Sequence, residues 1–209
     1  MKRIIKFFLD LLLKQTDTGR SIYYSRLSQN MISYRLFFLQ KILGFNRKCY
    51  WPVHFSSIIQ KPENILVGID TAPGIMNSCY IQGFGGIVMG DYTQVGPGVG
   101  IISLNHNPAN VYDYQKEKFP SIKIGSYCWL GMHSVILPGV ELGDFTIVGA
   151  GSIVTKSFLE GYCVIVGNPA KVVRRLQIEE CVRHKLDHEY YGYIPANRME
   201  EYRAKNLKI

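Results

Sequence analysis

Histidine and cysteine are the residue types in this chain that could carry acid–base or nucleophilic chemistry. The five cysteines are spread singly, and their odd number without a CxxC pair argues against a disulfide framework and favours a reducing compartment. His184 and His188 are four residues apart, a spacing that could bind a metal on a helix, but without an HExxH-like pattern a solvated helix face is favoured. His106 could move a proton near neutral pH. Taken alone it is more simply a surface-loop histidine, so its role depends on the elements around it.

A six-residue repeat organises the centre of the chain. Counting in sixes from Ile124 to Val154 places an aliphatic residue at the first position of six consecutive units, four of them followed by glycine. The fifth position of each unit is small, and these residues are Cys128, Ser134, Val140, Thr146 and Ser152. This period does not fit an α-helix and predicts a triangular coil of short strands, with positions one and five facing inward. Each turn would bury its apolar side against the next, and Cys128 would be a core residue.

The repeat breaks once. Ile101 and Ile124 are both first positions, yet they lie 23 residues apart, which is not a multiple of six. The excess is a polar, charged segment that contains two prolines, so residues 104–121 are predicted to project from the coil as an excursion loop. Loops on a rigid scaffold often carry function, and this one carries His106.

The chain is expected to have three parts. A helical segment over residues 1–50 precedes the coil over residues 51–172, and a helical tail over residues 173–209 follows it. Within the first part, ISYRLFFLQKIL from Ile32 to Leu43 predicts an amphipathic helix that ends at the next glycine.

Five apolar residues near the N-terminus also share one face at helical spacing, namely Ile4, Ile5, Phe8, Leu11 and Leu12. The run is too short to span a bilayer, and Lys6 and Asp10 interrupt it, so it does not read as a signal peptide. A helix that packs on its own protein or on a partner subunit is the favoured interpretation, and a helix lying in a membrane interface is the alternative.

The formal net charge of +8 suits an anionic ligand, a membrane surface or nucleic acid. The basic residues lie mainly in the first 50 residues and after Lys171 rather than in one dense run. Without an RNA- or DNA-binding motif, nucleic acid is not an expected partner.

The repeat units LGMHSVILPGVELGDFTIVGAGSIVTKSF and the later VGNPAKVVRR resemble the hexapeptide-repeat acyltransferases over about residues 60 to 176. The closer likeness is to the branch of galactoside, maltose, xenobiotic and surface-polysaccharide O-acetyltransferases. The resemblance implies an all-β fold, a left-handed parallel β-helix with helical additions at both termini. It also implies a homotrimer with active sites at the subunit boundaries.

The same resemblance gives His106 a role. The family branch places its catalytic histidine in a loop after a segment like IGPGVGIIS. The corresponding segment here is VGPGVGIIS over residues 95–103, and Leu104-Asn105-His106 follows it. The histidine would take the proton of an acceptor hydroxyl as it attacks the thioester of acetyl-CoA, a contribution of ~10²–10⁴ in rate. Transfer in the family is direct, without an acyl-enzyme, so Cys79 and Cys128 are not expected to be nucleophiles, and no metal is expected to be required.

Binding of acetyl-CoA is likewise implied by the resemblance. Trp129 would line the groove near the thiol, or pack against a neighbouring subunit, while backbone groups at nearby turns would pair with the pantetheine amides. Basic residues after the last repeats would meet the phosphates, although each could also be a solvated surface charge. The residues expected to bind acetyl-CoA are Trp129, Gly131, Gly149, Ala150, Thr155, Lys156, Lys171, Arg174 and Arg175.

The acceptor is expected to be a sugar or glycan, such as a surface-polysaccharide building block, bound by Asn77, Tyr80, Gln82 and Asn105. An amino-sugar N-acetyltransferase, a γ-type carbonic anhydrase and a non-enzymatic solenoid are the alternatives. The expected location is the cytoplasm, with peripheral contact at the inner face of the membrane left open through the N-terminal helix.

Overall fold

The computed structural model describes residues 10–114 and 120–209. The apolar face predicted between Ile4 and Leu12 therefore lies almost wholly outside the described residues, as does part of the excursion loop. Within the ranges given, no helix is both long enough and apolar enough to span a bilayer.

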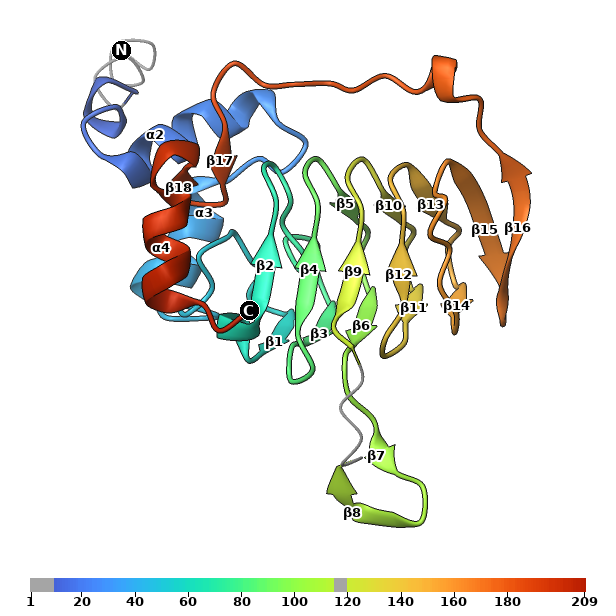
Figure 1. Cartoon of the computed structure of the whole chain (residues 1–209). Helices are drawn as coiled ribbons and strands as arrows, with labels where there is room; N and C mark the ends of the chain where they lie inside the picture. The colour runs from blue at the N-terminus through green and yellow to red at the C-terminus, as the bar shows by residue number, and fades with distance from the viewer. Residues whose placement is uncertain (1–9, 115–119) are drawn as a thin grey trace.

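Three sheets of parallel strands form the walls of a coil that makes up most of the molecule (Figure 1). The chain passes through the walls in a fixed order, so neighbouring strands of a wall belong to successive turns. The first wall holds β1 (Ile58–Gln60), β3 (Tyr80–Gln82), β6 (Gly100–Ile102), β11 (Val135–Ile136) and β14 (Ile153–Val154). The second wall holds β2 (Ile65–Val67), β4 (Ile87–Met89), β9 (Ile122–Ile124) and β12 (Glu141–Leu142). The third wall holds β5 (Gln94–Val95), β10 (Trp129–Leu130), β13 (Thr146–Val148), β15 (Cys163–Gly167) and the antiparallel β16 (Ala170–Arg175).

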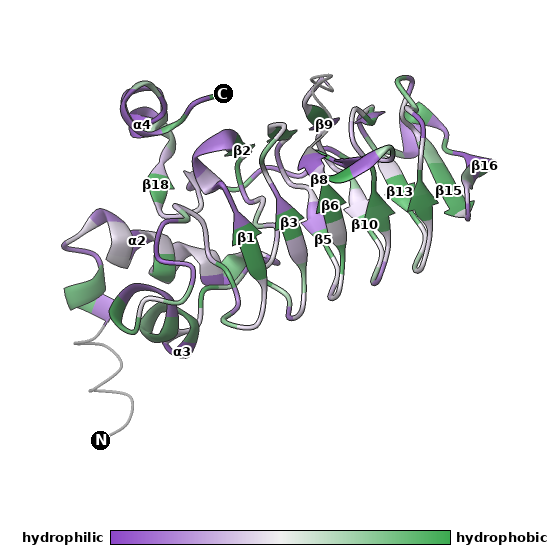
Figure 2. Cartoon of the chain, turned by 90° about the horizontal axis from the view of Figure 1, so that it is seen from below, coloured by the Kyte–Doolittle hydropathy of each residue, from purple (hydrophilic) through white to green (hydrophobic). Residues whose placement is uncertain are grey.

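The first positions of the repeat line the interior of the coil. On the first wall Ile101, Ile136 and Val154 are neighbours in register, and each is 0% exposed. The small residues at the fifth positions are buried as well, namely Cys128, Ser134, Val140, Thr146 and Ser152. The predicted coil of short strands and the inward position of Cys128 are thus confirmed. Figure 2 shows the result as hydrophobic strands joined by more polar connections.

A hairpin leaves the coil where the repeat breaks. It is formed by β7 (His106–Asn107) and β8 (Asn110–Tyr114), which pair in antiparallel fashion between β6 and β9. Figure 1 shows it projecting away from the corner that joins the first and second walls. The scaffold therefore holds His106 outside the row of stacked turns.

Helices cap the first turn of the coil at its N-terminal end (Figure 1). They are α2 (Asp17–Tyr24), η1 (Ser25–Leu27), α3 (Tyr34–Phe37) and the π-helical η2 (Phe38–Ile42). The helix predicted from Ile32 to Leu43 is observed as α3 continuing into η2, and Gly44 with a φ of 94° follows it. Trp51 is fully buried and its indole N–H donates to the Pro73 carbonyl at 2.9 Å, which ties the cap to the coil.

Aromatic rings stack along the corner between the second and third walls. Tyr92, Tyr127, Phe145 and Tyr162 follow one another with ring centroids 4.9 to 5.3 Å apart. Each has a left-handed backbone, with φ between 46° and 57°, because every turn bends in the same way at this corner. We call these four residues the aromatic ladder.

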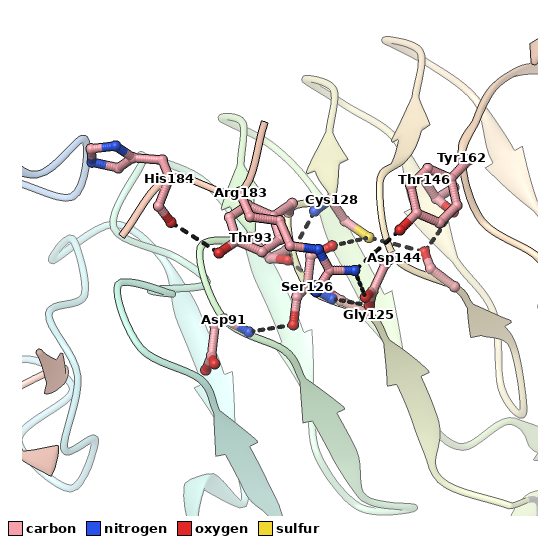
Figure 3. Close-up of polar contacts among 12 residues, drawn as sticks. Asp91, Thr93, Gly125, Ser126, Cys128, Asp144, Thr146, Tyr162, Arg183 and His184 are labelled. Carbon is pink, nitrogen blue, oxygen red and sulfur yellow. Dashed lines mark hydrogen bonds and ion pairs between the residues drawn. The ribbon is translucent and has the colours of Figure 1, made fainter. Parts of the chain in front are cut away.

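Residues 181–189 run along the aromatic ladder as an extended strap, back toward the N-terminal cap (Figures 1 and 3). The Arg183 guanidinium donates to the Tyr162 hydroxyl at 3.1 Å and pairs with the Asp144 carboxylate at 3.3 Å. The same guanidinium lies over the rings of Tyr127 and Phe145. One side chain thus fastens the strap to several turns of the coil.

The prediction of a helical tail over residues 173–209 is wrong for much of that segment, because the strap is not helical. The segment begins in β16 and ends in a helix, with η4 (Ile178–Glu180), β17 (Tyr190–Tyr191), β18 (Ile194–Pro195), η5 (Ala196–Arg198) and α4 (Met199–Asn206) along it. Its extended part is stabilised by tertiary hydrogen bonds in place of helical ones. The Tyr127 hydroxyl donates to the His184 carbonyl at 2.9 Å, and the Leu186 N–H donates to the Tyr92 hydroxyl at 3.1 Å.

His184 and His188 consequently lie on non-helical chain, His188 at a bend, and the helical spacing assumed for them is wrong. The His188 ring stacks on Tyr24 of α2 with ring centroids 3.7 Å apart. This contact packs the strap against the N-terminal cap.

Ile87→Ala tests the inward face of the coil. Ile87 is 0% exposed, so the substitution should lower the free energy of unfolding by about 2–5 kcal/mol through lost burial and a residual cavity. Urea unfolding followed by circular dichroism at fixed protein concentration measures the change. The control is Val88→Ala on the same strand, whose half-buried side chain faces outward and should cost clearly less; equal losses would contradict the assignment of faces.

Candidate functional site

His106 stands exposed on the projecting hairpin, with its ring held from the opposite strand. Its Nδ1 lies 3.0 Å from the Val111 carbonyl oxygen. A carbonyl oxygen can only accept, so Nδ1 donates to it, and in the neutral ring the lone pair then lies on Nε2. The hairpin therefore fixes the tautomer in which Nε2 can act as a base. Sequence reasoning did not identify Val111, because a backbone carbonyl leaves no mark in residue identity.

Buried polar groups anchor the root of the hairpin. The Gln82 side-chain oxygen accepts the Leu104 N–H at 2.9 Å, and the Ser103 hydroxyl donates to the Gln82 carbonyl. The same hydroxyl accepts the Gly85 N–H at 2.8 Å. Gln82, predicted to contact an acceptor, thus has its amide oxygen engaged in holding the loop that carries His106.

The other residues predicted to bind an acceptor are spread along the first wall. Asn105 is exposed beside His106, and Tyr80 is partly exposed at the start of β3 with its hydroxyl donating to Gln60 at 3.0 Å. Asn77 precedes β3, at the edge of the wall away from the hairpin root, and its carbonyl accepts the Gly98 N–H at 3.0 Å. The structure brings Gln82 and Asn105 toward the hairpin and leaves Asn77 at the far edge.

Trp129 lies on the third wall and is 56% exposed. It belongs to an outward row in which Gln94, Trp129, Ile147, Val164 and Arg174 are successive partners across the strands. Two residues predicted to bind acetyl-CoA, Trp129 and Arg174, therefore share one row. This row and the His106 hairpin lie on different sides of the same coil.

The backbone N–H groups of Gly131 and Gly149, at turns predicted to pair with the pantetheine amides, already donate hydrogen bonds within the coil. The Gly131 N–H donates to the Val148 carbonyl and the Gly149 N–H to the Ile165 carbonyl, both at 2.8 Å. A Cβ on Gly131 would lie 2.6 Å from the Val148 oxygen, so the close stacking of turns itself requires glycine there. Ala150, in contrast, is exposed at the next turn.

The basic residues predicted to meet phosphates occupy two places. Lys156, with Thr155, is exposed after β14, at the corner between the first and second walls. Lys171, Arg174 and Arg175 are exposed on β16 of the third wall.

Among these cations, Arg175 pairs with Glu160 at 2.9 Å, and Lys156 lies 5.7 Å from the centre of the Phe158 ring. Lys171 and Arg174 are thus better placed than Arg175 to meet an anion near Trp129.

The buried cysteines are poor nucleophiles. Burial raises the pKa of the Cys128 thiol to about 12 and also raises the pKa of Cys79. A thiol with such a pKa remains protonated at neutral pH. In the part of the chain that the structure describes, no group of three or more His, Cys, Asp or Glu side chains is placed to hold a metal ion.

Comparison with known proteins shows similarity to bacterial acetyltransferases over part of the chain. Residues 121–156 match the model of the bacterial transferase hexapeptide, six repeats. A putative acetyltransferase of Staphylococcus aureus (strain Mu50) is 40% identical over 104 residues, which cover 49% of this chain and 51% of the relative. The galactoside O-acetyltransferase of Escherichia coli (strain K12) is 37% identical over 94 residues, which cover 43% of this chain and 44% of that protein. The chain thus spans about half the length of the curated relatives it matches.

Solved structures show the same fold. A galactoside acetyltransferase in complex with coenzyme A has a TM-score of 0.52 and 23% identity, covering 84% of this chain and 88% of that one. A hexapeptide-repeat acetyltransferase from Vibrio cholerae O1 biovar eltor, complexed with acetyl coenzyme A, has a TM-score of 0.52 and 21% identity, covering 77% and 86%. The likeness implies that the coil of parallel sheets is a left-handed β-helix.

Gln82→Met tests the anchor of the hairpin. The variant keeps a side chain of similar size but lacks the oxygen that accepts the Leu104 N–H, so we expect the hairpin root to open more often. Amide hydrogen exchange at Leu104 should speed up by about tenfold, in line with the loss of one buried hydrogen bond. Gln82→Glu retains an acceptor and should exchange more slowly than Gln82→Met; identical rates in both variants and the wild type would contradict the anchor.

Proposed function

Since the chain carries the hexapeptide repeats of the bacterial transferases, we propose that it transfers an acetyl group from acetyl-CoA to a hydroxyl of a sugar or glycan. His106 is the general base. The observation that carries this assignment is the contact between its Nδ1 and the Val111 carbonyl, which leaves the lone pair on Nε2. The hairpin presents this base outside the coil, where a second molecule can reach it.

The reaction follows from this tautomer. His106 Nε2 takes the proton of the acceptor hydroxyl as the oxygen attacks the thioester carbonyl, and a C–O bond forms. The C–S bond then breaks, and the imidazolium returns its proton to the departing thiolate sulfur. General-base assistance of this kind contributes ~10²–10⁴ in rate. Direct transfer agrees with the raised pKa of the Cys128 thiol, which disfavours an acyl-cysteine.

Acetyl-CoA occupies the outward row of the third wall in this proposal. Trp129 offers an exposed ring to the pantetheine arm, and Lys171 and Arg174 offer cations to its phosphates. Their shared wall supports this assignment for them more than for Thr155 and Lys156, which follow another wall.

The active site is then shared between chains. His106 projects from the corner of the first and second walls, whereas Trp129 stands on the third. Within a single coil His106 and Trp129 lie on different sides. The base of one subunit therefore meets the acetyl donor bound to its neighbour. A closed homotrimer of parallel coils repeats this contact three times.

The acceptor is proposed as a sugar hydroxyl, and a surface-polysaccharide building block is the candidate class. Acetylation of an amino sugar uses the same base and donor site and differs only in the attacking atom. The reaction is placed in the cytoplasm, where the free thiols of this chain would stay reduced.

His106→Asn tests the base. Asparagine can keep a polar side chain on β7 but cannot accept a proton at neutral pH, so kcat for thiol release from acetyl-CoA with sugar acceptors should fall by ~10²–10⁴. Binding of CoA, measured by calorimetry, should be unchanged because the donor site lies on another wall.

His54→Asn is the matched control, since His54 lies outside both sites and its ring contacts Ser56. It should retain wild-type turnover. Full turnover in His106→Asn would contradict the assignment of the base, and a parallel panel of amino-sugar acceptors decides between hydroxyl and amine acceptors.

A further inference from the structure

A cavity lies at the N-terminal end of the molecule, apart from the hairpin and from Trp129. Its volume is 630 Å³, within the range of small-molecule sites. Its walls come from two parts of the chain, residues 17–50 of the N-terminal segment and residues 193–206, which include β18 and α4. Neither the proposed base nor the proposed acetyl-CoA site contributes to it.

The charge of this cavity is strongly positive. Its lining carries two carboxylates, of which Asp17 is already paired with Arg20 and Arg198. No acidic residue occurs between Asp17 and Glu63 in the sequence, whereas seven lysines and arginines do. The cations of the lining are Lys41, Arg47, Lys48, Arg198 and Lys205.

Lys41 is the most buried of these cations. Its ammonium donates to the Cys49 carbonyl at 2.7 Å and to the Arg47 carbonyl at 3.3 Å, and it lies 4.7 Å from the centre of the Tyr193 ring. None of these partners carries a full negative charge, and burial lowers the pKa of Lys41 to about 8. A desolvated cation of this kind gains stability from an anion placed beside it.

Aromatic rings complete the walls of the cavity. Tyr50 and Tyr202 contact each other with ring centroids 5.1 Å apart, and Phe37 and Tyr193 contribute further ring surface. The cavity thus combines a cationic part with an aromatic part. A ligand that carries both phosphates and a planar or apolar group would satisfy the two together.

We propose that this cavity binds a phosphorylated small molecule of the nucleoside diphosphate class. Lys41, Lys48 and Lys205 contact the phosphates, and the partly exposed ring of Tyr202, backed by the buried Tyr50, contacts the planar group. A lipid headgroup presents the same phosphate chemistry, and the experiment separates the two sources.

Calorimetric titration of the full chain with ADP and with inorganic pyrophosphate tests the proposal. Saturating CoA is present throughout, so that the proposed acetyl-CoA site is occupied. The wild type should bind both probes and bind ADP more tightly. Lys41→Met and Lys205→Ala should each weaken binding by about tenfold or more, as expected for loss of one charge-assisted contact.

Two variants serve as controls. Lys123→Ala removes an exposed lysine of the second wall, and Lys171→Ala removes a cation of the proposed acetyl-CoA site. Both should bind ADP as the wild type does. Lys205 is exposed on α4, so Lys205→Ala remains informative if Lys41→Met fails to fold.

Three results of the calorimetric titrations would overturn the proposal. The first is that the wild type binds neither ADP nor pyrophosphate. The second is that Lys41→Met and Lys205→Ala bind the probes as tightly as the wild type does. The third is that Lys171→Ala loses binding. Lysine-dependent binding to phosphatidylglycerol vesicles without binding of ADP would also overturn it and assign the site to lipid. None of these readouts depends on acetyl transfer, so failure of the proposed enzyme activity is distinguishable from failure of this site.

Discussion

The close stacking of successive turns is the constraint on which this structure depends. A Cβ on Gly131 would lie 2.6 Å from the backbone of the next turn, and the aliphatic residues of adjacent turns meet in a fully buried interior. A turn cannot bury its own apolar side, so each turn depends on its neighbours for stability. This requirement fixes the register of all three walls and leaves only corners and outward rows available for other uses.

The residues of the proposed chemistry accordingly lie on parts of the chain that the stacking of turns does not require. The His106 hairpin interrupts the coil at one corner, and Trp129 and Arg174 stand on an outward row of another wall. The aromatic ladder occupies the corner between the second and third walls. It holds the strap, which returns the chain to the N-terminal cap. That return forms the basic cavity at the N-terminal end of the coil, where residues 193–206 face the cap.

The periodic part of this architecture could be predicted from sequence, because a residue's position in the repeat decides whether it faces inward. The inward place of Cys128 followed directly, and so did the site of the hairpin, since an insertion in a strict repeat must leave the coil. The strap could not be predicted. Its hydrogen bonds join Tyr127 to His184 and Tyr92 to Leu186, groups 57 and 94 residues apart, and a polar segment without periodicity gave no sign of them. The roles of Val111 and Gln82 were hidden for a related reason: the one acts through a backbone carbonyl, and the other looks like any polar residue near a loop.

In the proposed trimer the base of one chain serves the acetyl donor on its neighbour, and mixing of variants distinguishes this arrangement from a site within one chain. His106→Ala and Trp129→Ala are each expected to be nearly inactive as pure proteins. After denaturation and co-refolding in equal amounts, about a quarter of the subunit boundaries should combine an intact His106 with an intact Trp129, and activity should recover toward that fraction of the wild type. A mixture no more active than its two components would show that the site lies within a single chain and would contradict the account.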